Sequence, residues 1–375
     1  MKIGVAWSAN SDSEQAGEKA AKAAVESSGS PIMTFLFITD AYDQRTVLEA
    51  VKNVVSGSKL AGFCCAGIIT SHMVLKQGVG VCTVNSDTVQ AATSLQGGLS
   101  RNPFIVGKNA GKELLANGID EGTVFLFPDG FGANISETVR GLYNTMGPNF
   151  KYVGGGSGDN LRFFKTYQFT ETNMMSDALA VAALKGITFE TAIGHGWTPL
   201  GEPVFIGRTE GKKVIEIDGR PAFEAYKERF TDINIDNFSE YGMRYPLGFP
   251  DIWGNYLIRD PIKVNSDQSI DFVTEVPDNA VGYLMEGNVD HLLGTATNVA
   301  ETICQKMEYP DFVLCMDCVS RYLLMGDEFE SELAIIEETI GNVPILGALT
   351  FGEVGSYLDV PHFHNKTLVL ASGGK

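Results

Sequence analysis

His195 is a first candidate for chemistry because glycine stands on both sides of it, in Gly194-His-Gly-Trp197. These glycines would leave the imidazole open to a ligand or cofactor, although a histidine so placed is more often a hydrogen-bonded structural residue. Cys65, Ser157 and Asp159 could join His195 in nucleophilic catalysis if the fold brings them together. No Gly-x-Ser-x-Gly elbow marks a serine nucleophile. An enzyme of small-molecule metabolism therefore stays open as an interpretation.

Three further patterns fall short of a defined site. The segment 107–113 has three residues between its glycines where a phosphate-binding loop needs four, and it ends in Glu113 instead of a hydroxyl residue. Cys315-Met-Asp-Cys318 is a lone pair of cysteines whose thiols would diverge on a strand. His362 and His364 could share one strand face, but no third metal ligand is identifiable. We therefore predict no metal site.

A repeated pattern must position any site that does exist. Apolar strands at 33–40, 123–130 and 311–318 are each followed by an amphipathic helix and a second strand. The second strands end in clusters of very small residues at 61–67, 152–159 and 346–353, and one more apolar run follows each cluster. Strand ends without bulky side chains allow close approach of another backbone or of a ligand.

This repetition predicts an α/β fold with mixed α+β sheets, built from strand-helix-strand-strand units. The first two units begin 90 residues apart, which indicates a pseudo-twofold N-terminal domain at 1–205, with repeats at about 1–95 and 96–200. The third unit falls in a C-terminal domain at 206–375. No copy is clear between residues 201 and 290, where closely spaced strands favour hairpins instead.

The composition of the chain limits which classes of partner it can bind and in which cellular compartment we expect it. The net charge is −18, from 46 acidic and 28 basic residues, so a nucleic acid or an anionic membrane is disfavoured. No signal peptide or membrane-spanning apolar window is found, and we expect a cytoplasmic protein. Six cysteines in 375 residues fit reduced thiols better than a disulfide framework.

Several short motifs resemble those of FIST proteins, named for F-box and intracellular signal transduction. Residues 194–203 followed by 217–222 resemble the junction between the two FIST regions. Further landmarks are 62–67 and 153–159 in the N-terminal region, and Tyr245-Pro-Leu-Gly248, Cys318-Val-Ser-Arg321, Gly352-Glu353 and Phe363-His-Asn-Lys-Thr367 in the C-terminal region. Two departures are His195, where many members have Cys, and Tyr322, where Gly is common.

The resemblance implies a cytoplasmic sensory protein that binds a small ligand, an amino acid or a derivative, in a pocket between or within its two domains. No kinase, cyclase or F-box module is recognisable, so it would signal by contact with a separate protein, such as a histidine kinase or a cyclic-dinucleotide enzyme. Some FIST-like proteins are haem-binding nitric oxide sensors. Haem is therefore a possible cofactor, with His195 as the first ligand to test, although no cofactor is required.

If the ligand is an amino acid, its carboxylate needs a planar fork or backbone amides, and its amine needs a carboxylate. Arg321 and Glu353 lie just beyond strands of the third unit, so we predict that they clamp this polar head, unless they simply pair with each other. Backbone donors and a side-chain acceptor would come from the other domain, and Arg220 is a further candidate. The residues from that domain are Gly154, Gly155, Gly156, Ser157 and Asp159.

Overall fold

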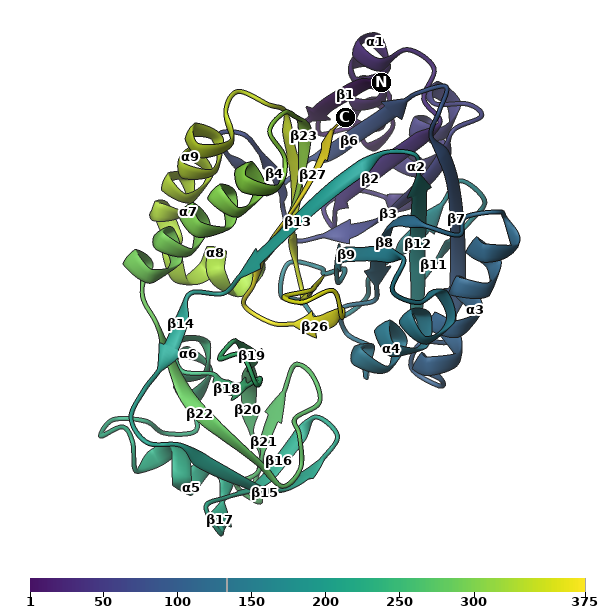
Figure 1. Ribbon diagram of the computed structural model, residues 1–375. Helices are drawn as coiled ribbons and strands as arrows, with labels where there is room; N and C mark the ends of the chain where they lie inside the picture. The colour runs from purple at the N-terminus through teal and green to yellow at the C-terminus, as the bar shows by residue number, and fades with distance from the viewer. Residues whose placement is uncertain (133, 375) are drawn as a thin grey trace.

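The computed structural model describes residues 1–132 and 134–374 and consists of three similar units around one core, with a segment inserted in the third unit (Figure 1). The first unit contains β1 (Lys2–Ser8), α1 (Ser13–Ser28), β2 (Met33–Thr39), α2 (Gln44–Val54), β3 (Lys59–Cys65), β4 (Ile68–Thr70), β5 (Val74–Leu75) and β6 (Val79–Asn85). The second contains β7 (Gln90–Gly97), α3 (Pro103–Ala116), β8 (Gly122–Pro128), α4 (Ile135–Met146), β9 (Phe150–Gly155), β10 (Gln168–Thr170), β11 (Met174–Met175) and β12 (Ala178–Lys185).

The third unit is interrupted after its first strand, β13 (Thr188–Gly194). It resumes with α7 (Val289–Lys306), β23 (Pro310–Cys318), α8 (Val319–Met325), η1 (Gly326–Glu328), α9 (Phe329–Ile340), β24 (Ile345–Thr350), β25 (Glu353–Gly355), β26 (His362–His364) and β27 (Leu368–Gly374). Within residues 1–132 and 134–374, no helix is long and apolar enough to cross a lipid bilayer.

The inserted segment forms a separate lobe, which lies at the lower left of Figure 1. Its strands form a nine-stranded antiparallel sheet. The predicted domain boundary at residue 205 falls within this segment. Its elements are β14 (Trp197–Pro199), β15 (Val204–Glu210), β16 (Lys213–Ile217), β17 (Arg220–Pro221), α5 (Ala222–Lys227), α6 (Phe238–Arg244), β18 (Leu247–Pro250), β19 (Tyr256–Arg259), β20 (Pro261–Val264), β21 (Ile270–Phe272) and β22 (Ala280–Gly287).

Each unit contributes two parallel strands joined by a helical connection, which is the geometry expected of a strand-helix-strand sequence. The pairs are β2 with β3, β8 with β9, and β23 with β24. The last long strand of each unit then pairs antiparallel with the first strand of this parallel pair: β6 with β2, β12 with β8, and β27 with β23. Three six-stranded mixed sheets result, which confirms the predicted α/β fold.

The three sheets turn their inner faces toward a shared aromatic core. Phe35 from the first sheet packs on Phe125 from the second, with ring centroids 4.7 Å apart. Phe125 packs in turn on Phe189, which packs on Phe312 in the third sheet. Each of these rings is at most 1% exposed, and burying one such side chain contributes roughly 1.5–3 kcal/mol. Helices cover the outer faces, so the strands are apolar on both sides.

Each unit also lends a short strand to a neighbouring sheet. β4 of the first unit pairs with β24 of the third, β10 of the second pairs with β3 of the first, and β25 of the third pairs with β9 of the second. The exchange is therefore cyclic. The chain leaves its own sheet at the small-residue clusters, so these clusters mark the crossing points between sheets.

At the crossing points the three clusters hydrogen-bond to one another through their backbones. Gly156 N–H donates to Gly352 O at 2.7 Å, and Gly158 N–H donates to Cys64 O at 3.0 Å. Leu349 N–H donates to Gly67 O at 2.9 Å. The small residues therefore serve close approach of backbone to backbone.

Gly154 should not tolerate a side chain. A Cβ built there would lie 1.9 Å from the carbonyl oxygen of Leu126 on the neighbouring strand, which is too rigid to move aside. We expect Gly154→Ala to destabilise the protein by about 1–3 kcal/mol or more. Gly294→Ala is the matched control, because a Cβ in that part of α7 meets nothing within 4 Å and alanine favours helix by about 0.5–1 kcal/mol. Urea denaturation of both variants measures these effects. A Gly154→Ala variant as stable as wild type would contradict the close approach between these strands.

Candidate functional site: a cavity between the inserted sheet and the third unit

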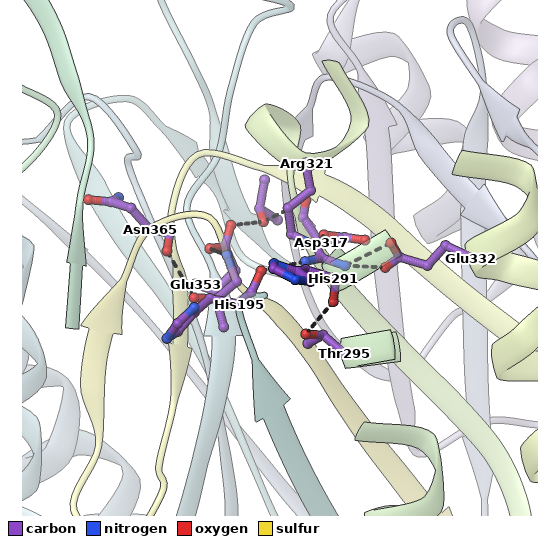
Figure 2. A network of polar contacts seen from close by, with 10 residues as sticks. His195, His291, Thr295, Asp317, Arg321, Glu332, Glu353 and Asn365 are labelled. Carbon is purple, nitrogen blue, oxygen red and sulfur yellow. Dashed lines mark hydrogen bonds and ion pairs between the residues drawn. The ribbon is translucent and has the colours of Figure 1, made fainter. Parts of the chain in front are cut away.

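Arg321 lies at the centre of a buried ion-pair network, shown in Figure 2. Its side chain is 0% exposed. Its Nε donates to Asp317 Oδ1 at 2.8 Å, and its Nη2 donates to both carboxylate oxygens of Glu332 at 2.7 Å. Burial opposes the charge of the guanidinium, but the two carboxylates outweigh it and raise the pKa of Arg321. Most of the hydrogen-bonding capacity of Arg321 is therefore already used inside the protein.

Arg321 also holds the connection to the inserted sheet. Its Nη1 donates to the carbonyl oxygen of His195 at 2.7 Å, immediately before β14. The imidazole of His195 faces its own chain, where Nδ1 accepts a hydrogen bond from Trp197 N–H at 2.9 Å. Burial, followed by the nearby Arg321, lowers the pKa of His195 to about 4. In the described residues no hydrogen bond joins this imidazole to Cys65 or Ser157, so the nucleophile-base arrangement is not formed.

Glu353 lies close to this network without joining Arg321. Oε1 accepts a hydrogen bond from Thr350 Oγ1 at 2.7 Å, and Oε2 accepts one from Thr367 N–H at 3.2 Å. Burial raises the pKa of Glu353 to about 8, against the effect of these hydrogen bonds. The pairing between Arg321 and Glu353 considered from the sequence is wrong, because Asp317 and Glu332 supply the carboxylates for Arg321.

The other candidates from the N-terminal half have partners within the fold. Gly154 and Gly155 pair with β25, which places Gly155 opposite Glu353, and Gly156 pairs with Gly352. The hydroxyl of Ser157 donates to Thr166 Oγ1 and accepts from Gln168 Nε2. Arg220 lies apart from all of these, on β17, where it pairs with Glu228.

Asp159 organises the loop that follows β9. Its carboxylate accepts hydrogen bonds from the backbone N–H groups of Phe163, Phe164 and Lys165, at 2.7–3.0 Å. The same loop holds Leu161 and Phe163 at positive φ of 65° and 52°, which is uncommon for residues other than glycine. Asp159 therefore fixes a strained loop that presents Leu161 and Phe163 to a cavity.

This cavity has a volume of about 230 Å³ and lies where three parts of the chain meet. Its apolar lining is Leu161, Phe163, Met243, Pro261, Ile262, Val273, Val319, Leu323 and Phe351. Its remaining lining is Ser239, Asp260, Cys318, Ser320, Gly352 and Asn365. The walls thus come from the loop after β9, from the inserted sheet with α6, and from the third unit, which contributes α8, the ends of β23 and β24, and the loop after β26.

Among the described residues that line the cavity, Asp260 is the charged one, and it is 8% exposed. Its Oδ2 accepts hydrogen bonds from Ser320 Oγ at 2.9 Å and lies 3.0 Å from the ammonium of Lys366. Burial raises the pKa of Asp260, while Lys366 opposes this shift. Lys366 itself donates to Met243 O, so the ion pair connects the third unit to the inserted segment.

Asn365 is the second buried polar residue of the cavity, at 1% exposure. Its Oδ1 accepts a hydrogen bond from Thr274 Oγ1 at 3.0 Å. Figure 2 shows its amide directed away from Glu353. Sequence reasoning did not nominate Asn365, Asp260 or Ser320 as site residues. A usable signal existed for two of them, because Ser320 and Asn365 lie inside the motifs 318–321 and 363–367.

Comparison with known families agrees with the two regions expected from these motifs. The FIST N domain matches residues 32–220, and the FIST C domain matches residues 222–356. The chain belongs to the FIST family. FIST domains are associated with signal transduction, and the family's two domains meet at residues 220–222, inside the inserted segment.

Relatives of this FIST protein are found in archaea and bacteria. An uncharacterized protein of Methanocaldococcus jannaschii is 25% identical over 241 residues, which is 57% of this chain and 46% of the relative. The chain thus spans less than half the length of that relative. Two uncharacterized proteins, one from Mycobacterium tuberculosis and one from Mycobacterium bovis, are 22% and 21% identical, and each alignment covers 99% of this chain and 98–99% of the relative.

Proposed function

We propose that this FIST protein is a sensor whose small ligand, an amino acid or a derivative, binds in the cavity between the inserted sheet and the third unit. The observation that carries the proposal is the composition of this cavity. Apolar side chains line most of it, and two buried polar side chains, Asp260 and Asn365, converge on it. A mostly apolar pocket with a few oriented polar groups is typical of small-molecule sites.

The location of the cavity also supports a sensory role. The inserted sheet joins the third unit through two short connections, at 194–197 and 287–289. A ligand that contacts both α8 and β20 favours one position of the inserted sheet relative to the three-sheet body. A separate signalling protein can then read that position by contact. In this account Arg321 does not contact the ligand. It lies on α8 and hydrogen-bonds the connection at His195, so it holds the cavity wall and the inserted sheet in place.

Thermal unfolding with a panel of amino acids and their derivatives tests the proposal. A ligand at 100 times its Kd stabilises the folded protein by about 2.7 kcal/mol. We expect Leu323→Trp, which places an indole at the cavity wall, to abolish the stabilisation. Leu115→Trp is the matched control, because Leu115 is similarly exposed but lies on α3, away from the cavity lining.

The location of the site would be contradicted if ligands stabilised Leu323→Trp as strongly as wild type. The sensory function itself would be contradicted if no member of the panel stabilised the wild-type protein.

A further inference from the structure

The size of the cavity limits the body of the ligand. An engineered protein cavity of about 150 Å³ with an apolar lining is enough to bind benzene. The present cavity, at about 230 Å³, therefore has room for one branched alkyl group or a single ring together with a small polar head. The apolar body would lie against side chains such as Ile262, Leu323 and Phe351.

The charges at the cavity decide what the polar head can carry. Among the described residues that line it there is no Lys, Arg or His. A ligand carboxylate would thus meet no cation there, and it would lie near the carboxylate of Asp260. A ligand ammonium would be a second cation beside Asp260, which already pairs with the fully buried Lys366. Burying a charge without its own partner costs several kcal/mol.

Two hydrogen-bonding positions in the lining remain open. Among the described residues, Ser320 and Lys366 both contact Oδ2 of Asp260, which leaves Oδ1 able to accept a hydrogen bond. Asn365 uses Oδ1 for Thr274, and within the part of the chain that the structure describes its Nδ2 has no acceptor. Asn365 is 1% exposed and Asp260 is 8% exposed as whole residues, so both groups lie largely inside the protein. A ligand that leaves them unpaired would bind more weakly, because each group would lose water without gaining a hydrogen-bond partner.

Resting on the proposed function, we infer that the cavity selects an uncharged carboxamide on a small apolar body, in preference to a free amino acid. The amide N–H donates to Asp260 Oδ1, and the amide oxygen accepts from Asn365 Nδ2. Both open positions are then satisfied, and no new charge enters the cavity. The ligand class is therefore an amino-acid derivative whose terminal charges have been removed.

A matched series with one isobutyl body tests this inference by calorimetric titration of the wild-type protein. The probes are isovaleramide, isovalerate, isoamylamine, leucine and methyl isovalerate. We expect isovaleramide to bind at least tenfold more tightly than the anion, the cation and the zwitterion. Methyl isovalerate keeps the carbonyl but has no N–H, so it should also bind more weakly than the amide. Leu323→Trp should lose the binding of isovaleramide, and Leu115→Trp should retain it.

Each contrary result has a distinct meaning. Leucine binding as tightly as isovaleramide, and only when the cavity is intact, would overturn the selection of an uncharged ligand and leave the sensor proposal standing. Methyl isovalerate binding as tightly as the amide would overturn the role of Asp260 as acceptor. Failure of isovaleramide to bind would overturn the inference, and failure of the whole earlier panel as well would remove the proposed function.

Discussion

Arg321→Met is expected to lower the free energy of unfolding by about 3–5 kcal/mol, the usual consequence of removing one partner from a buried ion pair. Methionine keeps much of the apolar stem but leaves Asp317 and Glu332 as neighbouring carboxylates, both 0% exposed. Asp317 already has one oxygen, Oδ2, without a hydrogen bond. The variant also loses the contact with the carbonyl oxygen of His195, so the connection to the inserted sheet should loosen.

Arg220→Met is the control for this experiment, because Arg220 is also paired with a glutamate but lies on the surface. Exposed ion pairs contribute little to stability, and we expect no measurable change. Urea denaturation at pH 7 compares the two variants with wild type. Equal stability of Arg321→Met and wild type would refute the structural role of Arg321. That result would favour the role predicted from the sequence, in which Arg321 binds the ligand directly.

Glu353→Gln is expected to become progressively more stable than wild type as the pH rises from 4.5 to about 8. Burial raises the pKa of Glu353 from 4.5 to about 8 in the folded protein. Over this interval the folded state holds a proton that the unfolded state has released, so wild-type stability falls as pH rises. The maximal slope for one group is about 1.4 kcal/mol per pH unit. Glutamine cannot ionise, and it can accept from Thr367 N–H and donate to Thr350 Oγ1.

The measurement is the difference in free energy of unfolding between Glu353→Gln and wild type, taken at several pH values from 4 to 9. Taking the difference cancels the contributions of other groups, such as His195, whose lowered pKa makes acid destabilising. We expect the difference to grow across the interval and to level off above pH 8. A difference that stays constant with pH would mean that Glu353 titrates normally in the folded protein.

The architecture could be predicted from the sequence because its signals are local. Strand-helix-strand spacing at 33–65, 123–155 and 311–350 depends on residues close together in the chain. The small-residue clusters also pointed to close approach at the strand ends. What approaches could not be predicted, since the partners of Gly156 and Gly158 are Gly352 and Cys64, which are far away in sequence.

The candidate site was less predictable for the same physical reason. The cavity exists because residues near 161, 260, 320 and 365 meet in space, and no periodicity links them. Arg321 was nominated as a ligand contact because its guanidinium suits a carboxylate. The sequence does not reveal that Asp317, four residues earlier, and Glu332 occupy that guanidinium. Asp260 carries no local motif, and its importance depends on Lys366 and Ser320.

Amide hydrogen exchange of the wild-type protein tests the central claim most directly. It is measured without ligand and with whichever of isovaleramide and leucine binds more tightly. Ligand in the cavity should slow exchange in 161–165, 260–263 and 318–323, because these segments contribute its three walls. Leu323→Trp should show no such change, and Leu115→Trp should behave as wild type. Protection confined to other segments, or protection of the same size in Leu323→Trp, would contradict a ligand site between the inserted sheet and the third unit.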